Sequence, residues 1–182
     1  TRRLVEQDEV LFLFNQLGTP TNTAIHKYVN AKKIPHLFLA TGATKWNDPK
    51  NYPWTMGWQP NYQTETRIYA AQILKERPSA KIAILYQNDD YGKDYLKGFE
   101  DGLGKANQKL ILLKQSYEVT DPTVDSQIVN LKNSGANVFM ADFEDSNAPS
   151  WRNVVDGQLN LFDAVRRTIR FETAGKRYEL AP

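Results

Sequence analysis

The stretch 80–104 constrains the fold more than any other part of this sequence. It begins with the apolar run 82–86, which shows no alternation, and this favours a strand that is buried on both faces of a parallel sheet. The polar loop 87–92 follows, and apolar residues then recur at helical spacing until Gly104, which favours the end of a helix. Strand, polar loop and helix are half of a βαβ unit, so the sequence predicts an α/β fold.

Strands and helices are expected to alternate along the rest of the chain in the same way. Apolar runs predict more buried strands, and helical spacing predicts more helices. The inward faces that we expect for these helices are Ala24, Ile25 and Tyr28; Thr66, Ala70, Ile73 and Leu74; and Val124, Ile128 and Leu131. The expected strands are 10–14, 37–39, 110–113 and 138–141, and the expected helices are 21–31, 63–77 and one beginning at 121–122. Near the end, alternation on both sides of 173–176 predicts a β-hairpin, preceded by a helix after Ser150.

The stretch 45–63 interrupts this pattern with three prolines and five aromatic residues. Proline spacing indicates an ordered crossover instead of a floppy linker. Its aromatic side chains could pack over a ligand, or they could fasten the crossover to the core. Both interpretations remain open from the sequence.

Composition excludes several classes of protein. The chain has 23 basic and 21 acidic residues and a net charge of +2, so nothing in it demands nucleic acid or an anionic membrane. It has no cysteine, which excludes disulfides and thiolate chemistry. No apolar run approaches the length of a membrane helix, and we expect no signal peptide. The opening residues are typical of a helix end, which indicates a fragment of a longer protein.

Residues 5–138 resemble the branched-chain amino acid binding proteins of ABC transporters, which have the type I periplasmic binding fold. The resemblance is carried by LFLFNQLGTPTNTAIHKYVNAKKIPHLFLATGATKW, NYPWTMGWQPNYQTE, AKIAILYQNDDYGKDYLKG and SYEVTDPTVDSQIVNLKNSGANVF. It implies two Rossmann-like lobes that clamp an amino acid or a similar small solute. It also implies a further unit before Leu4 that this sequence lacks.

The resemblance implies a binding site on loops at the carboxyl ends of strands, where ligands of open α/β sheets bind. The implied ligand-binding residues are Gln16, Leu17, Gly18, Thr19, Gly42, Ala43, Thr44, Asp90 and Tyr91. Backbone N–H groups and threonine hydroxyls can hold a carboxylate, Tyr91 can cover an aliphatic side chain, and Asp90 can meet an ammonium group. The alternative for each is an ordinary turn residue or a solvated acid.

Residues 133–182 instead resemble an early segment of malate synthase, a TIM-barrel enzyme. The segments ADFEDS, NVVDGQLNL and GKRYEL carry this resemblance. The regions covered by the two resemblances adjoin at NSGANVFM, which would suit either family. The arginine, the magnesium-binding acids and the aspartate that the enzyme family uses for catalysis are absent from the sequence. We therefore interpret the chain as a chimera or fragment and expect no malate synthesis from it.

Two clusters of titratable residues have alternative interpretations. Asp142, Glu144 and Asp145 could ligate Mg²⁺ at the end of a strand, or they could form a solvated acidic loop, which we favour. His26 and His36 lack the partners of a catalytic triad or a metal site, so we interpret both as structural or surface residues. No cofactor and no metal is expected.

The prediction is therefore an α/β protein with partial type I periplasmic-binding-protein-like lobes and a helix–hairpin tail. We expect partial lobe one at 1–45, a crossover at 46–63, partial lobe two at 64–140 and the malate-synthase-like tail at 141–182.

The expected function is non-catalytic capture of an amino acid or related solute for an ABC importer. The expected partners are that small molecule, a transporter permease and, through exposed sheet edges, another copy of the chain. The expected location is periplasmic or extracytoplasmic, and cytoplasmic if the malate synthase likeness dominates. The alternatives are a malate synthase fragment acting on acetyl-CoA and glyoxylate, and a chimera with no function.

Overall fold

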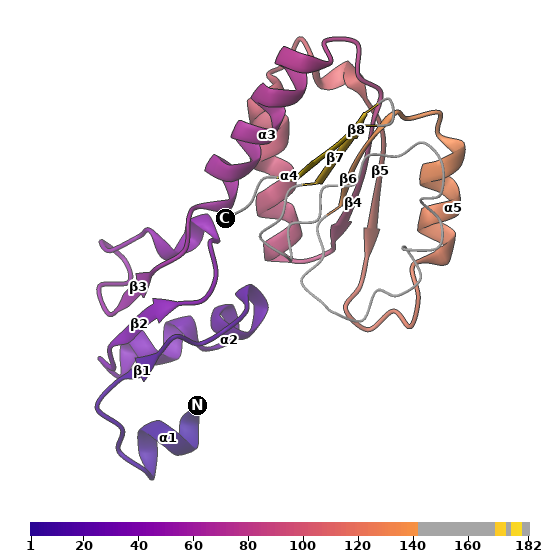
Figure 1. The fold of residues 1–182 in the computed structure, drawn as a ribbon. Helices are drawn as coiled ribbons and strands as arrows, with labels where there is room; N and C mark the ends of the chain where they lie inside the picture. The colour runs from indigo at the N-terminus through magenta and orange to yellow at the C-terminus, as the bar shows by residue number, and fades with distance from the viewer. Residues whose placement is uncertain (142–169, 174–175, 180–182) are drawn as a thin grey trace.

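The computed structural model describes residues 1–141, 170–173 and 176–179. These residues form two three-stranded parallel sheets and a two-stranded hairpin, as Figure 1 shows. We call the first sheet with its helix lobe one, and the second sheet with its helices lobe two. Lobe one contains α1 (Arg2–Glu6), β1 (Leu13–Phe14), α2 (Thr19–Ala31), β2 (His36–Leu39), η1 (Thr44–Trp46) and β3 (Thr55–Gly57). Lobe two contains α3 (Tyr62–Glu76), β4 (Ile82–Gln87), α4 (Asp90–Leu103), η2 (Gln108–Leu110), β5 (Ile111–Tyr117), α5 (Asp125–Asn133) and β6 (Val138–Ala141).

Strand β4 is the centre of lobe two, with strand order β5-β4-β6. Helices α3 and α4 cover one face of this sheet and α5 covers the other (Figure 1). Ile82 and Ile84 belong to the core on the α3–α4 side, whereas Ala83 and Leu85 belong to the core on the α5 side. All four are 0% exposed, so the predicted strand buried on both faces is confirmed. The predicted end of α4 at Gly104, which has φ +69°, is also confirmed.

Helices α3 and α4 pack so closely that glycine is required between them. A Cβ atom built on Gly98 would lie 2.3 Å from the Cα atom of Gln63 and 2.2 Å from the Oγ1 atom of Thr66. Of the four predicted inward residues of α3, Thr66, Ala70 and Ile73 are buried and Leu74 is partly buried. This contact packs the middle of α4 against the first turns of α3.

Lobe one differs from the prediction in which side chains it buries. We expected Ala24, Ile25 and Tyr28 to form the inward face of α2, but the buried residues are Thr19, Asn22, His26 and Val29. Polar groups orient the helix: the Asn22 side chain donates to backbone carbonyl oxygens at its N-terminal end, and Thr19 bonds to Thr41. Apolar periodicity does not detect such polar anchors, which explains the shifted face.

The predicted buried strand 10–14 is shorter and more exposed than expected. Only Leu13 and Phe14 form β1, and Leu13 is buried while Phe14 is 61% exposed. Phe14 contacts Phe38 on β2, and Phe38 contacts Trp58 just after β3, so a row of rings crosses the sheet. The buried side chains of β1 and β2 are Leu13, His36 and Leu39. The apolar run therefore predicted a strand correctly, but its prediction of burial on both faces was wrong.

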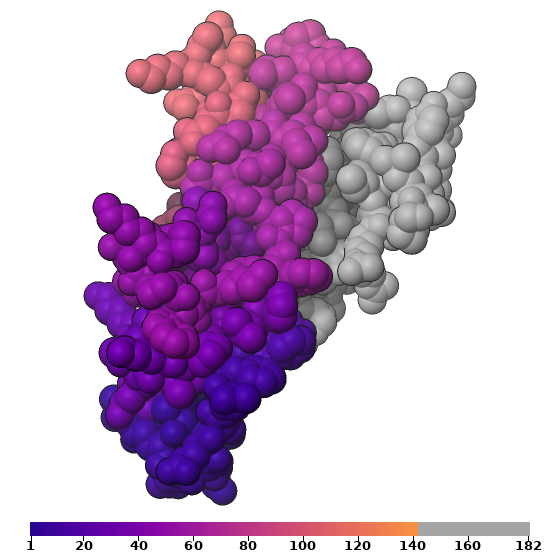
Figure 2. Space-filling view, turned by 90° about the vertical axis from the view of Figure 1, so that its left-hand side faces the viewer, coloured from indigo at the N-terminus to yellow at the C-terminus, as the bar shows by residue number. Residues whose placement is uncertain are grey.

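The remaining elements agree with the sequence in type but differ at several boundaries: β5 runs to Tyr117 instead of 113, and the expected crossover contains the strand β3. Strand β6 has the predicted bounds, and α5 buries Ile128 and Leu131 but begins at Asp125, after the expected 121–122 start. The predicted hairpin is confirmed as β7 (Arg170–Thr173) paired antiparallel with β8 (Lys176–Glu179). The helix expected after Ser150 lies outside the described residues. Figure 2 shows lobe one, in indigo to purple, below the magenta helix α3.

Candidate functional site

Thr41, just after β2, is the centre of a buried polar cluster in lobe one. It is 1% exposed, and its Oγ1 atom shares a 2.6 Å hydrogen bond with the Oγ1 atom of Thr19. The same oxygen accepts from the Trp46 indole N–H at 3.1 Å and the Ala43 backbone N–H at 3.3 Å. It also lies 3.4 Å from the Tyr62 hydroxyl, which donates to it. A hydroxyl has one donor and two acceptor sites, so these four contacts fill the capacity of Thr41, and at least two of the donors share one acceptor site.

The segment before α2 joins this cluster through Thr19. Gly18 caps α2 in the left-handed region at φ +94°, and its carbonyl accepts from the Asn22 amide at 2.6 Å. The Gln16 carbonyl also accepts from that amide, while the Gln16 Oε1 atom is buried and has no partner in the described part of the chain. Leu17 is 72% exposed and bridges to Ala40 in parallel register. The structure thus places the predicted segment 16–19 against Ala40 and Thr41, immediately before the predicted residues 42–44, at the carboxyl ends of β1 and β2.

A second polar cluster connects lobe one to helix α4. The Thr44 backbone N–H and hydroxyl both donate to the Asp94 Oδ2 atom, at 2.8 and 3.0 Å. Lys45 Nζ lies 2.6 Å from Asp90 Oδ2, and Thr23 also donates to Asp90 at 3.3 Å. The hydrogen bond from Lys45 is the main reason that the pKa of Asp90 is lowered. Asp90 therefore forms an ion pair between the lobes.

Tyr91 lies beside this contact but is buried. It is 5% exposed, and its ring packs against the rings of Tyr62 and Tyr95, each with centroids 5.2 Å away. Its backbone N–H donates to Asp89, the N-cap of α4, at 2.9 Å. In this arrangement Tyr91 contributes to the packing of the lobe contact.

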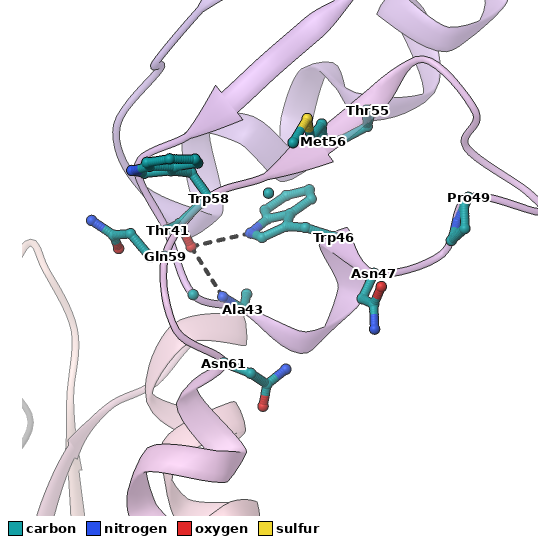
Figure 3. A pocket seen from close by; sticks show the side chains of 12 residues that line it. Thr41, Ala43, Trp46, Asn47, Pro49, Thr55, Met56, Trp58, Gln59 and Asn61 are labelled. Carbon is teal, nitrogen blue, oxygen red and sulfur yellow. Dashed lines mark hydrogen bonds between the residues drawn. The ribbon is translucent and has the colours of Figure 1, made fainter.

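A cavity of about 410 Å³ opens next to the Thr41 cluster, between η1, β3 and the start of α3 (Figure 3). Figure 3 shows the Trp46 indole between β3 and the loop that carries Thr41 and Ala43. Several lining side chains are solvent-exposed, so the cavity is accessible from outside. The lining residues are Thr41, Gly42, Ala43, Trp46, Asn47, Pro49, Thr55, Met56, Gly57, Trp58, Gln59 and Asn61.

Two predicted site residues, Gly42 and Ala43, line this cavity, and the other predicted residues lie outside its lining. Gly42 has no room for a side chain, because a Cβ atom there would lie 2.1 Å from the Pro60 carbonyl oxygen. Sequence reasoning did not single out Thr41, Asp94 or Asn61. Thr41 could have been identified from the sequence, because it stands in the loop predicted to follow the strand 37–39. Asp94 stands in mid-helix, where no local pattern distinguishes it from a solvated acid.

Both histidines are buried, which corrects the option of a surface position. His36 is 0% exposed, and burial lowers its pKa to about 4, with a smaller contribution from the charge of His26. His26 stacks on Tyr52 with centroids 3.8 Å apart, and burial followed by the charge of Lys45 lowers its pKa. The burial of His26 and His36 agrees with the interpretation of both as structural residues.

No metal site is found among the described residues, where no three His, Cys, Asp or Glu side chains form a group that could hold an ion. The acidic stretch Asp142, Glu144 and Asp145 lies outside the described residues. Among the helices that the structure describes, none combines the length and apolar character needed to cross a membrane.

Comparison with solved structures identifies this architecture. The chain superposes on a substrate-binding periplasmic protein from Ralstonia solanacearum with a TM-score of 0.74 and 22% identity, covering 88% of this chain and 45% of that one. A branched chain amino acid ABC transporter protein from Thermus thermophilus with bound valine gives a TM-score of 0.62 and 14% identity, with coverages of 77% and 36%. A solute binding protein from R. palustris in complex with benzoate gives 0.66 and 13%, with coverages of 80% and 40%. At these identities the likeness concerns the fold alone.

Curated relatives of this sequence carry the name malate synthase. The protein from Myxococcus xanthus is 59% identical over 142 residues, which cover 69% of this chain and 26% of that protein. The bifunctional glyoxylate cycle protein of Caenorhabditis elegans is 57% identical over 71 residues, covering 38% of this chain and 7% of that protein. The chain thus spans about a quarter or less of these relatives.

The family assignment comes from a model described as periplasmic binding protein, which matches residues 1–160. This range includes both sheets and extends past residue 138, where we placed the end of that resemblance. The matched range and the parallel-sheet lobes agree, and the chain belongs to the periplasmic binding protein family.

Proposed function

We propose that this chain binds a small organic solute, an amino acid or a related molecule, without catalysing a reaction on it. The observation that carries the proposal is the cavity of about 410 Å³ beside Gly42 and Ala43, at the carboxyl end of β2. Ligand sites of parallel α/β proteins lie at this end of the strands. The volume falls within the range of small-molecule sites.

The lining of the cavity supports binding more than chemistry. Trp46, Trp58 and Met56 provide apolar surface, and the side-chain amides of Asn47 and Gln59 provide polar groups. Such a mixture of apolar surface and a few polar groups is typical of solute sites. None of the lining residues is a histidine, acid or lysine that could act as a general acid or base.

The contact between the lobes supports a binding cycle that involves closure. The Thr44–Asp94 and Lys45–Asp90 contacts join lobe one to α4 through exposed or half-buried polar groups. Polar contacts of this kind exchange readily with water and allow two lobes to separate and close. We propose the nine predicted residues as the region in which this closure takes place.

A thermal-shift experiment tests the function. A panel containing valine, leucine, benzoate and benzamide is added to the protein, and a solute that binds the folded state raises the melting temperature. Trp58→Ala, which alters the cavity wall, should reduce the shift. Trp54→Ala is the matched control, because Trp54 is also exposed but does not line the cavity. The proposal fails if no solute raises the melting temperature, or if both variants respond alike.

The family supports an extracytoplasmic protein that delivers its solute to an ABC transporter permease. We propose that the permease is the macromolecular partner and that a second copy of the chain is a further partner. Co-purification with a permease, with and without the solute, tests this part of the proposal.

A second candidate function follows from the curated relatives, which are named malate synthase and reach 59% identity. A chain that is part of such an enzyme would take part in forming malate from acetyl-CoA and glyoxylate with Mg²⁺. An assay of free coenzyme A release from these substrates tests it directly. Release above that of a heat-denatured sample would favour the enzyme over the binding protein.

A further inference from the structure

One face of the lobe-one sheet carries aromatic side chains that remain exposed. Leu13, His36 and Thr55 are in register across β1, β2 and β3, so their side chains share one face of the sheet. All three are buried, and Thr55 accepts a 2.7 Å hydrogen bond from Asn30 of α2, so this is the face that α2 covers. Phe14 follows Leu13 in β1 and therefore points to the opposite face.

Four aromatic rings form a continuous row on this opposite face, which we call the aromatic row. Phe12 contacts Phe14, Phe14 contacts Phe38, and Phe38 contacts Trp58, with ring centroids 6.5, 5.6 and 5.2 Å apart. All three contacts are edge-to-face, so the row presents ring faces and ring edges in alternation. The face of an aromatic ring is electronegative and its edge is electropositive. A row of this kind is therefore complementary to a second row like itself.

The exposed area of the aromatic row suits a protein interface. Phe12, Phe14 and Trp58 are 45%, 61% and 68% exposed, and Phe38 is partly exposed. Since each such side chain has about 150–250 Å² of surface, the row offers on the order of 400 Å² of apolar area. A standard interface buries about 800 Å² on each partner, and a little over half of that area is apolar. The row thus supplies about the apolar area that one side of a dimer needs.

The absence of charge allows the aromatic row to pair with itself. A two-fold interface brings the same patch together from both subunits, so a charged residue at its centre would face its own copy. Like charges that meet across an interface are unfavourable. None of the four residues in the row is charged, and two rows can therefore approach without this penalty.

We propose that the aromatic row is the surface through which two copies of this chain associate, face to face, about a two-fold axis. The inference rests on the second-copy partner proposed above and specifies its contact, which lies on a sheet face instead of the sheet edges expected from the sequence. Parallel sheets are almost always covered on both faces. A second copy at this face would cover lobe one as α5 and the α3–α4 pair cover lobe two.

Sedimentation equilibrium of the full chain, over about a hundredfold range of concentration around micromolar values, measures the dimer dissociation constant. Phe14→Lys places a charge in the aromatic row, and Phe12→Lys does the same outside strand β1, which keeps the test available if Phe14→Lys does not fold. Ile68→Lys is the matched control, because Ile68 is 63% exposed on α3 in lobe two. Trp58 is left unaltered because it also lines the cavity. Thermal melts establish which variants are folded.

The unmodified chain and Ile68→Lys should form dimers with the same dissociation constant. Each folded phenylalanine variant should raise that constant by about tenfold or more, the effect of losing one central aromatic contact. A dimer that the phenylalanine variants leave unchanged, or that Ile68→Lys weakens equally, would overturn the inference while the second-copy partner stands. A monomer at every concentration would overturn both, and the face would then belong to another part of the chain or to a different protein. The thermal shifts of the solute panel test solute binding separately from either result.

Discussion

His36 should make the stability of lobe one depend on pH. It lies in the middle strand of the sheet, is 0% exposed, and neither ring nitrogen has a hydrogen-bond partner within the described residues. Burial lowers its pKa from 6.5 to about 4. Between these values the unfolded chain binds a proton at this residue and the folded chain does not. Stability is therefore lost as the pH falls from 6.5 towards 4, and the loss stops below that.

The size of this effect follows from the pKa change. A lowering from 6.5 to about 4 corresponds to about 3 kcal/mol when the transition is complete. At pH 5 the unfolded chain is almost fully protonated at His36, so about 2 kcal/mol should already be lost relative to pH 7. This is a large fraction of the stability of an ordinary domain.

The substitution His36→Leu removes the titrating group and also removes two buried nitrogens that have no partner. Urea unfolding is followed by tryptophan fluorescence at pH 7 and pH 5, because Trp46, Trp54 and Trp58 all report on lobe one. Carboxylates and His26 titrate in both proteins, so the difference between the two pH dependences isolates His36. The variant should lose about 2 kcal/mol less than the unmodified protein over this interval. Parallel curves for the two proteins would refute the reasoning.

Three further predictions concern lobe two. Leu85→Ala removes a fully buried side chain from the central strand and should lower the free energy of unfolding by about 2–5 kcal/mol, measured by urea titration; a loss below about 1 kcal/mol would contradict the described core. Asp89→Ala removes the N-cap that accepts from the Tyr91 and Gly92 N–H groups, and should destabilise α4 by about 1 kcal/mol, with exposed Lys93→Ala as the control in the same melts. Gly98→Ala introduces a Cβ atom 2.3 Å from the Cα atom of Gln63 and should destabilise by about 1–3 kcal/mol despite the better helix propensity of alanine; an unchanged melting temperature would mean that α3 and α4 are further apart.

The candidate site was only partly predictable from the sequence. Gly42 and Ala43, which the family resemblance implied on a polar loop after a buried strand, line the cavity of the candidate site. Thr41, which connects the segments before and after α2, looks like an ordinary turn residue until the fold places Thr19 and Trp46 against it. Asp94 is separated from Thr44 by 50 residues, so their contact depends on how lobe one meets α4.

What the sequence determined by itself was the local structure: an apolar run without alternation at β4, a helical stripe ending at Gly104, and alternation around a turn in the β7–β8 hairpin. Each of these signals lies within a few residues, because strand and helix periodicity is a local property. The tertiary structure decided which faces are covered and which polar groups meet. Phe14 is exposed and His26 is buried against the hydropathy pattern, since burial depends on the layer that packs on each face. The contact between Thr44 and Asp94 likewise depends on how lobe one meets α4, which no local pattern encodes.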